Sequence, residues 1–548
     1  MDKRKNIGAG AETFTGNKGL RIEEPLIFEL GDLETTGVDF EDDFSLFTHE
    51  RPFHVIAGLD PAIHKQPGSL GLRSAPPEDD EKGVAVEARL GALGRTETIG
   101  LPGLSEPETV RHYVRLSRRN YSIDSGIFPL GSCTMKHNPR LNEKMARLPG
   151  FADIHPLQPQ STVQGALELI DALAHWLIEL TGMASVAMSP KAGAHGELCG
   201  MVAIRAAHEA SGEWATRRAV LVPDSAHGTN PATAALLGFD VRAIKAETDG
   251  TVSLNAVREA LGPDVAAMML TNPNTCGLFE PQIGAIAEAL HEAGAYLYCD
   301  GANFNAIAGL VRPGDLGVDA MHINLHKTFS TPHGGGGPGA GPVVFSEALS
   351  RFAPLPRVER NGEGFHIVEH GDGGDRLTAF HGQMGMFVRA LAYMMSHGAD
   401  GVAQASKDAV LNANYIRARL KDVMSQPFPA RPCMHEALFD DAFLKDTGVT
   451  TLDFAKALID EGFHPMTVYF PLVAHGAMLI EPTESESKQS LDQFIDTMRF
   501  LAEAAIRGDL DRFKTAPNFA PRRRLDETRA ARAPVLRYTP PTRAIAAE

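Results

Sequence analysis

The chain has 548 residues, 43% apolar and 22% charged, which is the composition of an ordinary globular protein of two to four domains. Its 69 acidic residues outnumber 52 basic ones, and the net charge of −17 argues against nucleic acid or an anionic membrane surface as the main partner. No stretch has the roughly 18 apolar residues of a membrane-spanning helix, and the five cysteines form no Cys-x-x-Cys pair. We therefore expect reduced thiols, no metal centre and a cytoplasmic location.

The first part of the chain shows little periodicity, and we expect residues 1–150 to form an N-terminal segment. Within it, residues 46–95 mix proline, glycine and charge, which predicts an exposed insertion. Further on, Ser161 with Gln164 three residues later matches a capping box. This pattern predicts a helix that ends at Gly182.

Residues 151–380 alternate between short apolar runs and amphipathic segments, which is typical of a large α/β domain whose parallel sheet is covered on both faces. The runs expected to be strands are 185–189, 219–223, 265–271, 295–299, 319–325 and 342–347. The clearest helical segments are 165–180, 196–210 and 282–293.

Residues 381–510 are predicted to contain a helical connection, at 381–421, and a small α+β domain. Its expected strands are 434–439, 466–471 and 476–482, and its expected helices are 451–462 and 484–507. Ser485 or Thr483 is expected to cap the last helix. From residue 508 onward, and as a separate segment at 511–548, we expect a loose tail.

Polar side chains follow the predicted strands at their carboxyl ends, where open parallel sheets bind their ligands. They are Gly193, Ala194 and His195 after the first strand, His227 after the second, Asn272 after the third, Asp300 and Asn303 after the fourth, and His326 and Lys327 after the fifth. Because these strand ends share one edge of the sheet, we expect one shared pocket.

The residue types at this edge suit pyridoxal phosphate. A glycine-rich turn that opens a helix at Gly193 offers backbone N–H groups to a phosphate. Asp300 can pair with a protonated ring nitrogen, His227 can lie against a ring, and Lys327 can bond covalently to an aldehyde. Each residue alone has an ordinary structural explanation, so the prediction depends on their occurring together.

Other residues compete for parts of these roles. Lys136 and Lys191 are alternatives to Lys327, although Lys191 lies in the expected phosphate loop and Lys136 precedes the main sheet. His322 and His326 are four residues apart, which is a metal-binding spacing only on a helix. On the predicted strand we expect no metal site from them.

Several longer motifs resemble the glycine-cleavage P-protein family, glycine dehydrogenase (decarboxylating). They are "GSCTMKHNPR" at 131–140, "SPKAGAHGE" at 189–197, "SAHGTNPATA" at 225–234, "TNPNTCGLFE" at 271–280, "YCDGANFNA" at 298–306, "NLHKTFSTPHGGGGPG" at 324–339 and "EPTESES" at 481–487. The likeness is to subunit 2, the C-terminal half in organisms that divide the enzyme, over residues 12–45 and 96–540. Residues 46–95 depart from the family pattern.

This resemblance implies the aspartate-aminotransferase-like fold (fold type I of the pyridoxal-phosphate-dependent transferases), with a mainly parallel seven-stranded sheet and a smaller α+β C-terminal domain. It implies that Lys327 holds the cofactor while Asp300 faces its ring nitrogen and His227 stacks on the ring. Further cofactor contacts are expected from Gly193, Ala194 and His195 at the phosphate, from Asn272 and Asn303 at the phenolic oxygen, and from His326.

The activity implied is decarboxylation of glycine with transfer of the aminomethyl group to the lipoyl arm of H-protein. The resemblance also implies a separate subunit 1 that completes a heterotetramer. Two alternatives stay open. One is another fold type I enzyme that acts on a small amino acid without lipoyl transfer, and the other is a structural subunit that is inactive without its partner.

Overall fold

The computed structural model describes residues 13–15, 103–333, 339–371 and 373–537. The chain divides into two compact units, Met1–Gly19 with Tyr121–Arg524, and Leu20–Asn120 with Leu525–Glu548. Among the described residues, the second unit contains helices α2 (Glu106–Ser117) and α16 (Glu527–Arg532). The insertion predicted at 46–95 lies outside the described residues.

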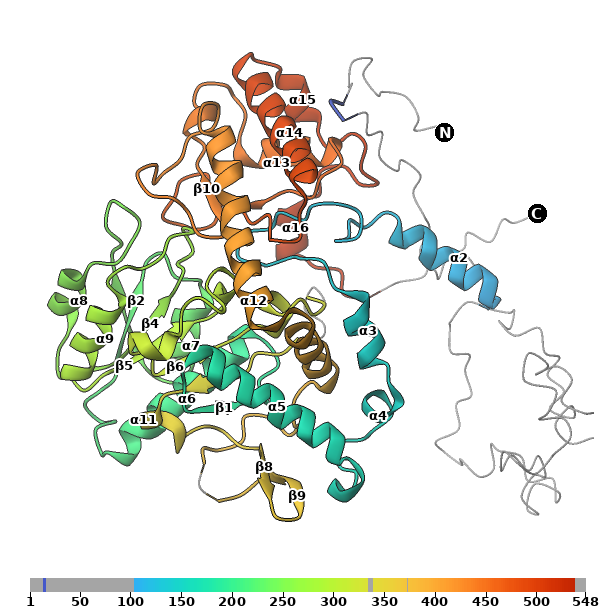
Figure 1. Cartoon of the computed structure of the whole chain (residues 1–548). Helices are drawn as coiled ribbons and strands as arrows, with labels where there is room; N and C mark the ends of the chain where they lie inside the picture. Colours follow the sequence, from blue (N-terminus) through green and yellow to red (C-terminus); the bar gives the residue numbers. More distant parts are fainter. Residues whose placement is uncertain (1–12, 16–102, 334–338, 372, 538–548) are drawn as a thin grey trace, which may run out of the picture. The chain divides into compact units, whose positions relative to one another are not determined.

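The main sheet of the first unit has seven strands in the order β1-β7-β6-β5-β4-β2-β3. They are β1 (Ser185–Ala187), β2 (Ala219–Pro223), β3 (Asp240–Ile244), β4 (Val265–Thr271), β5 (Tyr296–Asp300), β6 (Ala320–His322) and β7 (Val343–Phe345). Figure 1 labels strands β1, β2, β4, β5 and β6 of this sheet. Strands β3, β2, β4, β5 and β6 are parallel to one another, whereas β7 pairs antiparallel with β6 and β1. The expected mainly parallel sheet is confirmed, although the exposed edge strand β3 was not predicted.

Both faces of this sheet are buried, as the alternation along β4 shows. Met268 and Leu270 join the core formed with α5 (Gln164–Thr181) and α9 (Ile283–Glu292). Met269 on the opposite face joins the core formed with α6 (Gly193–Ala210). The other helices of this part are α3 (Arg140–Ala146), α4 (Pro149–Ala152), α7 (Thr229–Leu236), α8 (Leu254–Ala260), α10 (Leu325–Thr328) and α11 (Glu347–Ser350).

A smaller α+β domain follows helix α12 (Met384–Leu420), whose helical geometry is broken at Gly398. Its antiparallel sheet has the order β10-β12-β11, with β10 (Ala437–Phe439), β11 (Thr467–Val468) and β12 (Met478–Ile480). Helices α13 (Thr451–Asp460) and α14 (Lys488–Ile506) pack on it in one hydrophobic core. A separate hairpin, β8 (Arg357–Asn361) with β9 (Gly364–Val368), precedes α12. The expected smaller domain is therefore confirmed.

One predicted helix start is wrong. A short 3₁₀ turn at Gln160–Thr162 comes first, and α5 begins at Gln164 with Val163 as its N-cap, so Ser161 does not cap it. The predicted end is confirmed, because Gly182 adopts the left-handed conformation with φ of 68°.

The predicted cap of the last long helix is also wrong. Helix α14 is capped by Ser487, whose Oγ accepts the Ser490 backbone N–H at 3.1 Å. Neither Thr483 nor Ser485 caps it, because their hydroxyl groups bond to each other at 2.9 Å in the preceding turn.

The prediction of a loose tail from residue 508 is wrong for residues 510–519. Residues Leu510–Thr515 form helix α15, and the Phe513 ring is fully buried with its centroid 6.2 Å from that of Phe454. The Asp460 carboxylate then accepts the backbone N–H groups of Asn518 and Phe519. Within the described part of the chain, none of the helices is both long and apolar enough to cross a membrane.

We expect Phe513→Ala to lower the free energy of unfolding by about 3–5 kcal/mol, because it removes a fully buried ring from the small domain. Leu472→Ala is the matched control, since that side chain is 83% exposed and its removal changes stability by about 0.5 kcal/mol at most. Urea unfolding followed by circular dichroism measures both. Equal stability of the two variants would contradict the packing of α15.

Candidate active site

Lys327 lies on the one-turn helix α10, because β6 ends at His322, earlier than the sequence predicts. Its side chain is buried, with 7% exposure, and its Nζ donates a hydrogen bond to the Ser132 carbonyl oxygen at 2.7 Å. The amine therefore lies inside the protein at the carboxyl ends of the parallel strands.

Asp300, the last residue of β5, is held by three neighbours. Asn230 donates to its Oδ2 at 2.9 Å, the Ala302 backbone N–H donates to Oδ1 at 2.9 Å, and His322 Nε2 lies 3.4 Å from Oδ1. Burial opposes ionisation of Asp300, but His322, these hydrogen bonds and the charge of Lys327 bring its pKa below the usual value. The site thus contains an ionised carboxylate.

His322 and Asn230 are site residues that sequence reasoning missed, since His322 was considered only as half of a metal pair. His322 Nδ1 lies 2.6 Å from the Tyr298 hydroxyl, and the two rings are stacked. Tyr298 and Asp300 are two residues apart on β5, so they point to the same side of the sheet. The spacing of two between Tyr298 and Asp300 was the sequence signal that polar side chains gather on this side of the strand.

The first turn of α6 contains Gly193, Ala194 and His195, as expected. Among the described residues no side chain caps this helix, so the backbone N–H groups of its first turn are available to an anion. A Cβ at Gly193 would lie 2.9 Å from Asn324 Nδ2, which explains the glycine. His195 Nδ1 instead accepts the Lys191 backbone N–H at 3.2 Å.

The two asparagines already have protein partners. Asn272 Oδ1 accepts the Glu280 backbone N–H at 3.0 Å, and Asn303 Nδ2 donates to the Pro273 carbonyl oxygen at 3.1 Å. These bonds position the loop after β4. A contact of either amide with a cofactor stays a prediction.

The two predicted histidines differ in environment. His227 is exposed, lies 2.8 Å from the Thr229 hydroxyl and turns its ring edge-on to Phe470. His326 is buried, which lowers its pKa to about 3 and keeps the ring neutral, and its Nδ1 accepts the Ala340 backbone N–H at 3.3 Å. Stacking of His227 on a ring stays a prediction.

The two competing lysines occupy other environments. Lys136 Nζ is buried in an ion pair with Glu484 at 2.6 Å and also donates to the Thr328 carbonyl oxygen at 2.7 Å. Lys191 is exposed, and its Nζ lies 5.8 Å from the centre of the Phe380 ring. Both arrangements leave Lys327 as the favoured candidate for covalent chemistry.

A buried acidic cluster was also missed. His435 and Glu436, which precede β10, meet Glu481, which follows β12, with ligand-type atoms within 4.8 Å of one another. The Glu436 carboxylate accepts the Ser132 backbone N–H, so the cluster adjoins the residue that binds Lys327. Acids flanking two otherwise apolar strands were the signal for it.

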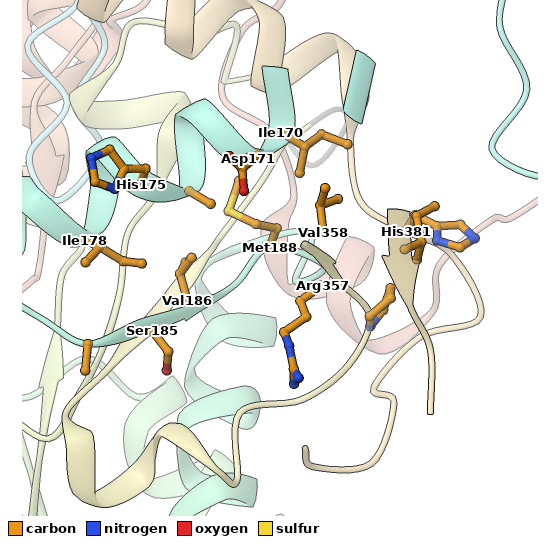
Figure 2. A pocket seen from close by; sticks show the side chains of 14 residues that line it. Ile170, Asp171, His175, Ile178, Ser185, Val186, Met188, Arg357, Val358 and His381 are labelled. Atoms are coloured by element: carbon orange, nitrogen blue, oxygen red, sulfur yellow. The ribbon is translucent and has the colours of Figure 1, made fainter. Parts of the chain in front are cut away.

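The cavity in Figure 2 is a separate feature of about 310 Å³. Helix α5 contributes Asp171 and His175, β1 contributes Val186, and the β8–β9 hairpin contributes Arg357 and Val358 (Figure 2). None of the predicted site residues lines it.

Comparison with known proteins gives consistent results. Residues 199–355 match the model of the aminotransferase class-V family, and residues 405–519 match that of the glycine dehydrogenase C-terminal domain. A probable glycine dehydrogenase (decarboxylating) subunit 2 of Caulobacter vibrioides is 64% identical over 97% of this chain and 95% of its own. The Oceanobacillus iheyensis protein of the same name is 50% identical over 85% of this chain and 96% of its own.

The solved structures that resemble this chain share its fold. A crystal structure of the glycine decarboxylase (P-protein) of the glycine cleavage system aligns with a TM-score of 0.65 at 22% identity, covering 77% of this chain and 96% of that one. The cysteine desulfurase CsdA of Escherichia coli aligns with a TM-score of 0.53 at 14% identity, covering 69% and 95%.

The sheet, the smaller C-terminal domain and these likenesses define a fold type I transferase architecture. Within that class, the sequence identity over nearly the whole chain determines the family. The chain belongs to the glycine dehydrogenase (decarboxylating) subunit 2 family.

We expect Lys136→Met to lower the free energy of unfolding by about 3–5 kcal/mol, because it leaves Glu484 buried without its partner. Adding Glu484→Gln should recover part of the loss. Lys488→Met is the control, since its ion pair with Asp492 is exposed and its loss should leave the stability nearly unchanged. Chemical denaturation measures all three, and a stable Lys136→Met protein would contradict a structural role for this lysine.

Proposed function

We propose that this chain uses pyridoxal phosphate to decarboxylate glycine and transfers the aminomethyl group to the lipoyl arm of H-protein. The observation that carries the proposal is the buried amine of Lys327 at the same sheet edge as the ionised carboxylate of Asp300. The family membership supplies the reaction, and these two groups supply its chemical requirements.

The residues present fit this cofactor. The uncapped first turn of α6 suits a phosphate, Asp300 suits a protonated ring nitrogen, and Lys327 suits the aldehyde. The Asn324 Oδ1 atom, next to that helix, is buried without a hydrogen-bond partner among the described residues. Because buried polar atoms are normally hydrogen-bonded, this atom is available to a ligand.

The chemistry that pyridoxal phosphate supplies when bound is a cationic ring that accepts the electron pair released by decarboxylation. Asp300 keeps a negative charge at the ring side of the site, and Asn230 with His322 holds that carboxylate in place. Lys327, whose Nζ donates to the Ser132 carbonyl oxygen, would hold the aldehyde of the cofactor until the amino group of glycine takes its place. Burial of the surrounding side chains limits access of water to the reacting carbon.

The bond between the carboxylate and the α-carbon of glycine breaks and CO₂ leaves. The α-carbon then forms a bond to one lipoyl sulfur as the disulfide breaks, and the other sulfur takes up a proton. We propose subunit 1 as the partner that completes the enzyme, as the name of the relatives indicates, and a cytoplasmic location, which suits five free thiols.

We expect borohydride reduction of the cofactor-loaded protein to fix the cofactor on Lys327, and peptide mapping to locate it. Lys327→Ala should abolish the adduct, whereas Lys191→Ala should retain it because that side chain is exposed. An adduct at Lys136 or Lys191 in the wild-type protein would contradict the assignment. A protein that forms no lysine adduct would favour a structural subunit instead.

We expect Asp300→Asn to keep the lysine adduct but to slow glycine–bicarbonate exchange by about 100-fold or more, because the amide carries no charge to hold the ring nitrogen protonated. The assay contains subunit 1 and lipoylated H-protein. Exchange by the wild-type enzyme should require H-protein. Release of CO₂ that ignores H-protein would instead indicate a decarboxylase without lipoyl transfer.

A further inference from the structure

The carboxyl groups of Glu436 and Glu481 meet inside the protein, and both residues have 0% exposure. They flank β10 and β12, which are antiparallel neighbours, and an oxygen of each carboxyl group lies within 4.8 Å of the other. Two negative charges this close in the dry interior repel each other strongly, so one group of such a pair carries a proton. The pair therefore holds one proton and one negative charge.

The donors around the pair indicate which residue is ionised. Glu436 accepts the Ser132 backbone N–H and the Asn303 side-chain amide, the latter at 3.3 Å. Glu481 accepts only the Thr134 hydroxyl, at 2.5 Å, and its Oε2 has no donor among the described residues. More donors stabilise the charged form, so the charge belongs on Glu436 and the proton on Glu481.

The surroundings agree with this assignment. Burial raises the pKa of Glu436 to about 7, and burial together with the charge of Glu436 raises the pKa of Glu481 well above its usual value. Burial lowers the pKa of His435 to about 3, so that ring is neutral. The other ionisable groups of the described residues that act on the cluster are Lys327, Lys136, Glu484, Cys133, Cys276 and Cys433.

Ser132 connects the pair to the candidate active site. Its backbone N–H donates to Glu436, and its carbonyl oxygen accepts the Lys327 amine at 2.7 Å. Only Ser132 therefore separates a negative charge on Glu436 from the Lys327 amine.

We propose that Glu436 and Glu481 form a carboxylate–carboxyl pair that places one negative charge and one proton beside Lys327, with Ser132 as the link. The inference rests on the function proposed above for the role of Lys327. Glu436 is then a positioning residue, whose negative charge favours the cationic form of the Lys327 Nζ atom. Glu481, because it is protonated, limits the negative charge of the pair to one.

The proton is tested on cofactor-free protein. Infrared difference spectra at about pH 8 should show the C=O stretch of a buried protonated carboxyl group that disappears in Glu481→Gln. The band should persist in the control Glu143→Gln, whose carboxylate pairs with Arg389. A Glu481→Gln spectrum that keeps this band would overturn the proposal.

The charge is tested on cofactor-loaded protein by the pH dependence of its absorbance. Glu436→Gln should lower the pH midpoint of the lysine-bound form by about 1 pH unit, because it removes a nearby opposite charge. Glu481→Gln should leave the midpoint unchanged, since glutamine resembles the protonated acid, and Glu436→Asp should restore it. Equal shifts in both glutamine variants, or no shift in either, would overturn the proposal.

A bound cation is the competing explanation, and metal analysis of the purified protein decides it. One equivalent of metal in the wild-type protein, lost in both glutamine variants, would overturn the shared proton. Failure of the proposed function is seen separately, because a wild-type protein without any lysine adduct would contradict that function while the infrared result still decides the state of the pair.

Discussion

The candidate site depends on keeping a lysine amine inside the protein without trapping it in a salt bridge. An isolated ammonium group taken out of water costs several kcal/mol, so a buried lysine needs nearby negative charge. Among the described residues, however, no carboxylate lies within ion-pair distance of Lys327 Nζ. Asp300 and Glu436 act on it from further away, and in the part of the chain that the structure describes only the Ser132 carbonyl oxygen bonds to it directly.

The segment before the large domain makes this arrangement possible. Leu130 forms a β-bridge with Ile480 of the small domain, and Gly131 lies so close to Leu479 that a Cβ would meet its backbone oxygen at 2.7 Å. Ser132 and Thr134 then reach the two buried acids. A motif far from Lys327 in sequence thus joins both domains at the site, and its glycine is required by close backbone approach.

The sequence was sufficient for the features that repeat locally. Apolar runs of strand length and the polar residues that follow them predict the sheet edge, and they predict Lys327 and Asp300 at that edge. The short helix α10 was missed because a single turn leaves no periodic signal. The Glu436–Glu481 pair was missed because it depends on the antiparallel pairing of β10 with β12, which brings together residues 45 positions apart.

Hydrogen-bond capacity explains why two buried lysines in one region can have different roles. An ammonium group has three donors. Lys136 has four acceptors in reach, from Asn305, Thr328, Tyr393 and Glu484, so nothing remains for a ligand. Lys327 has one acceptor among the described residues, and that acceptor is a neutral carbonyl oxygen, which holds the amine less strongly than a carboxylate does. Burial alone therefore does not distinguish a reactive lysine from a structural one, whereas the number and charge of its acceptors do.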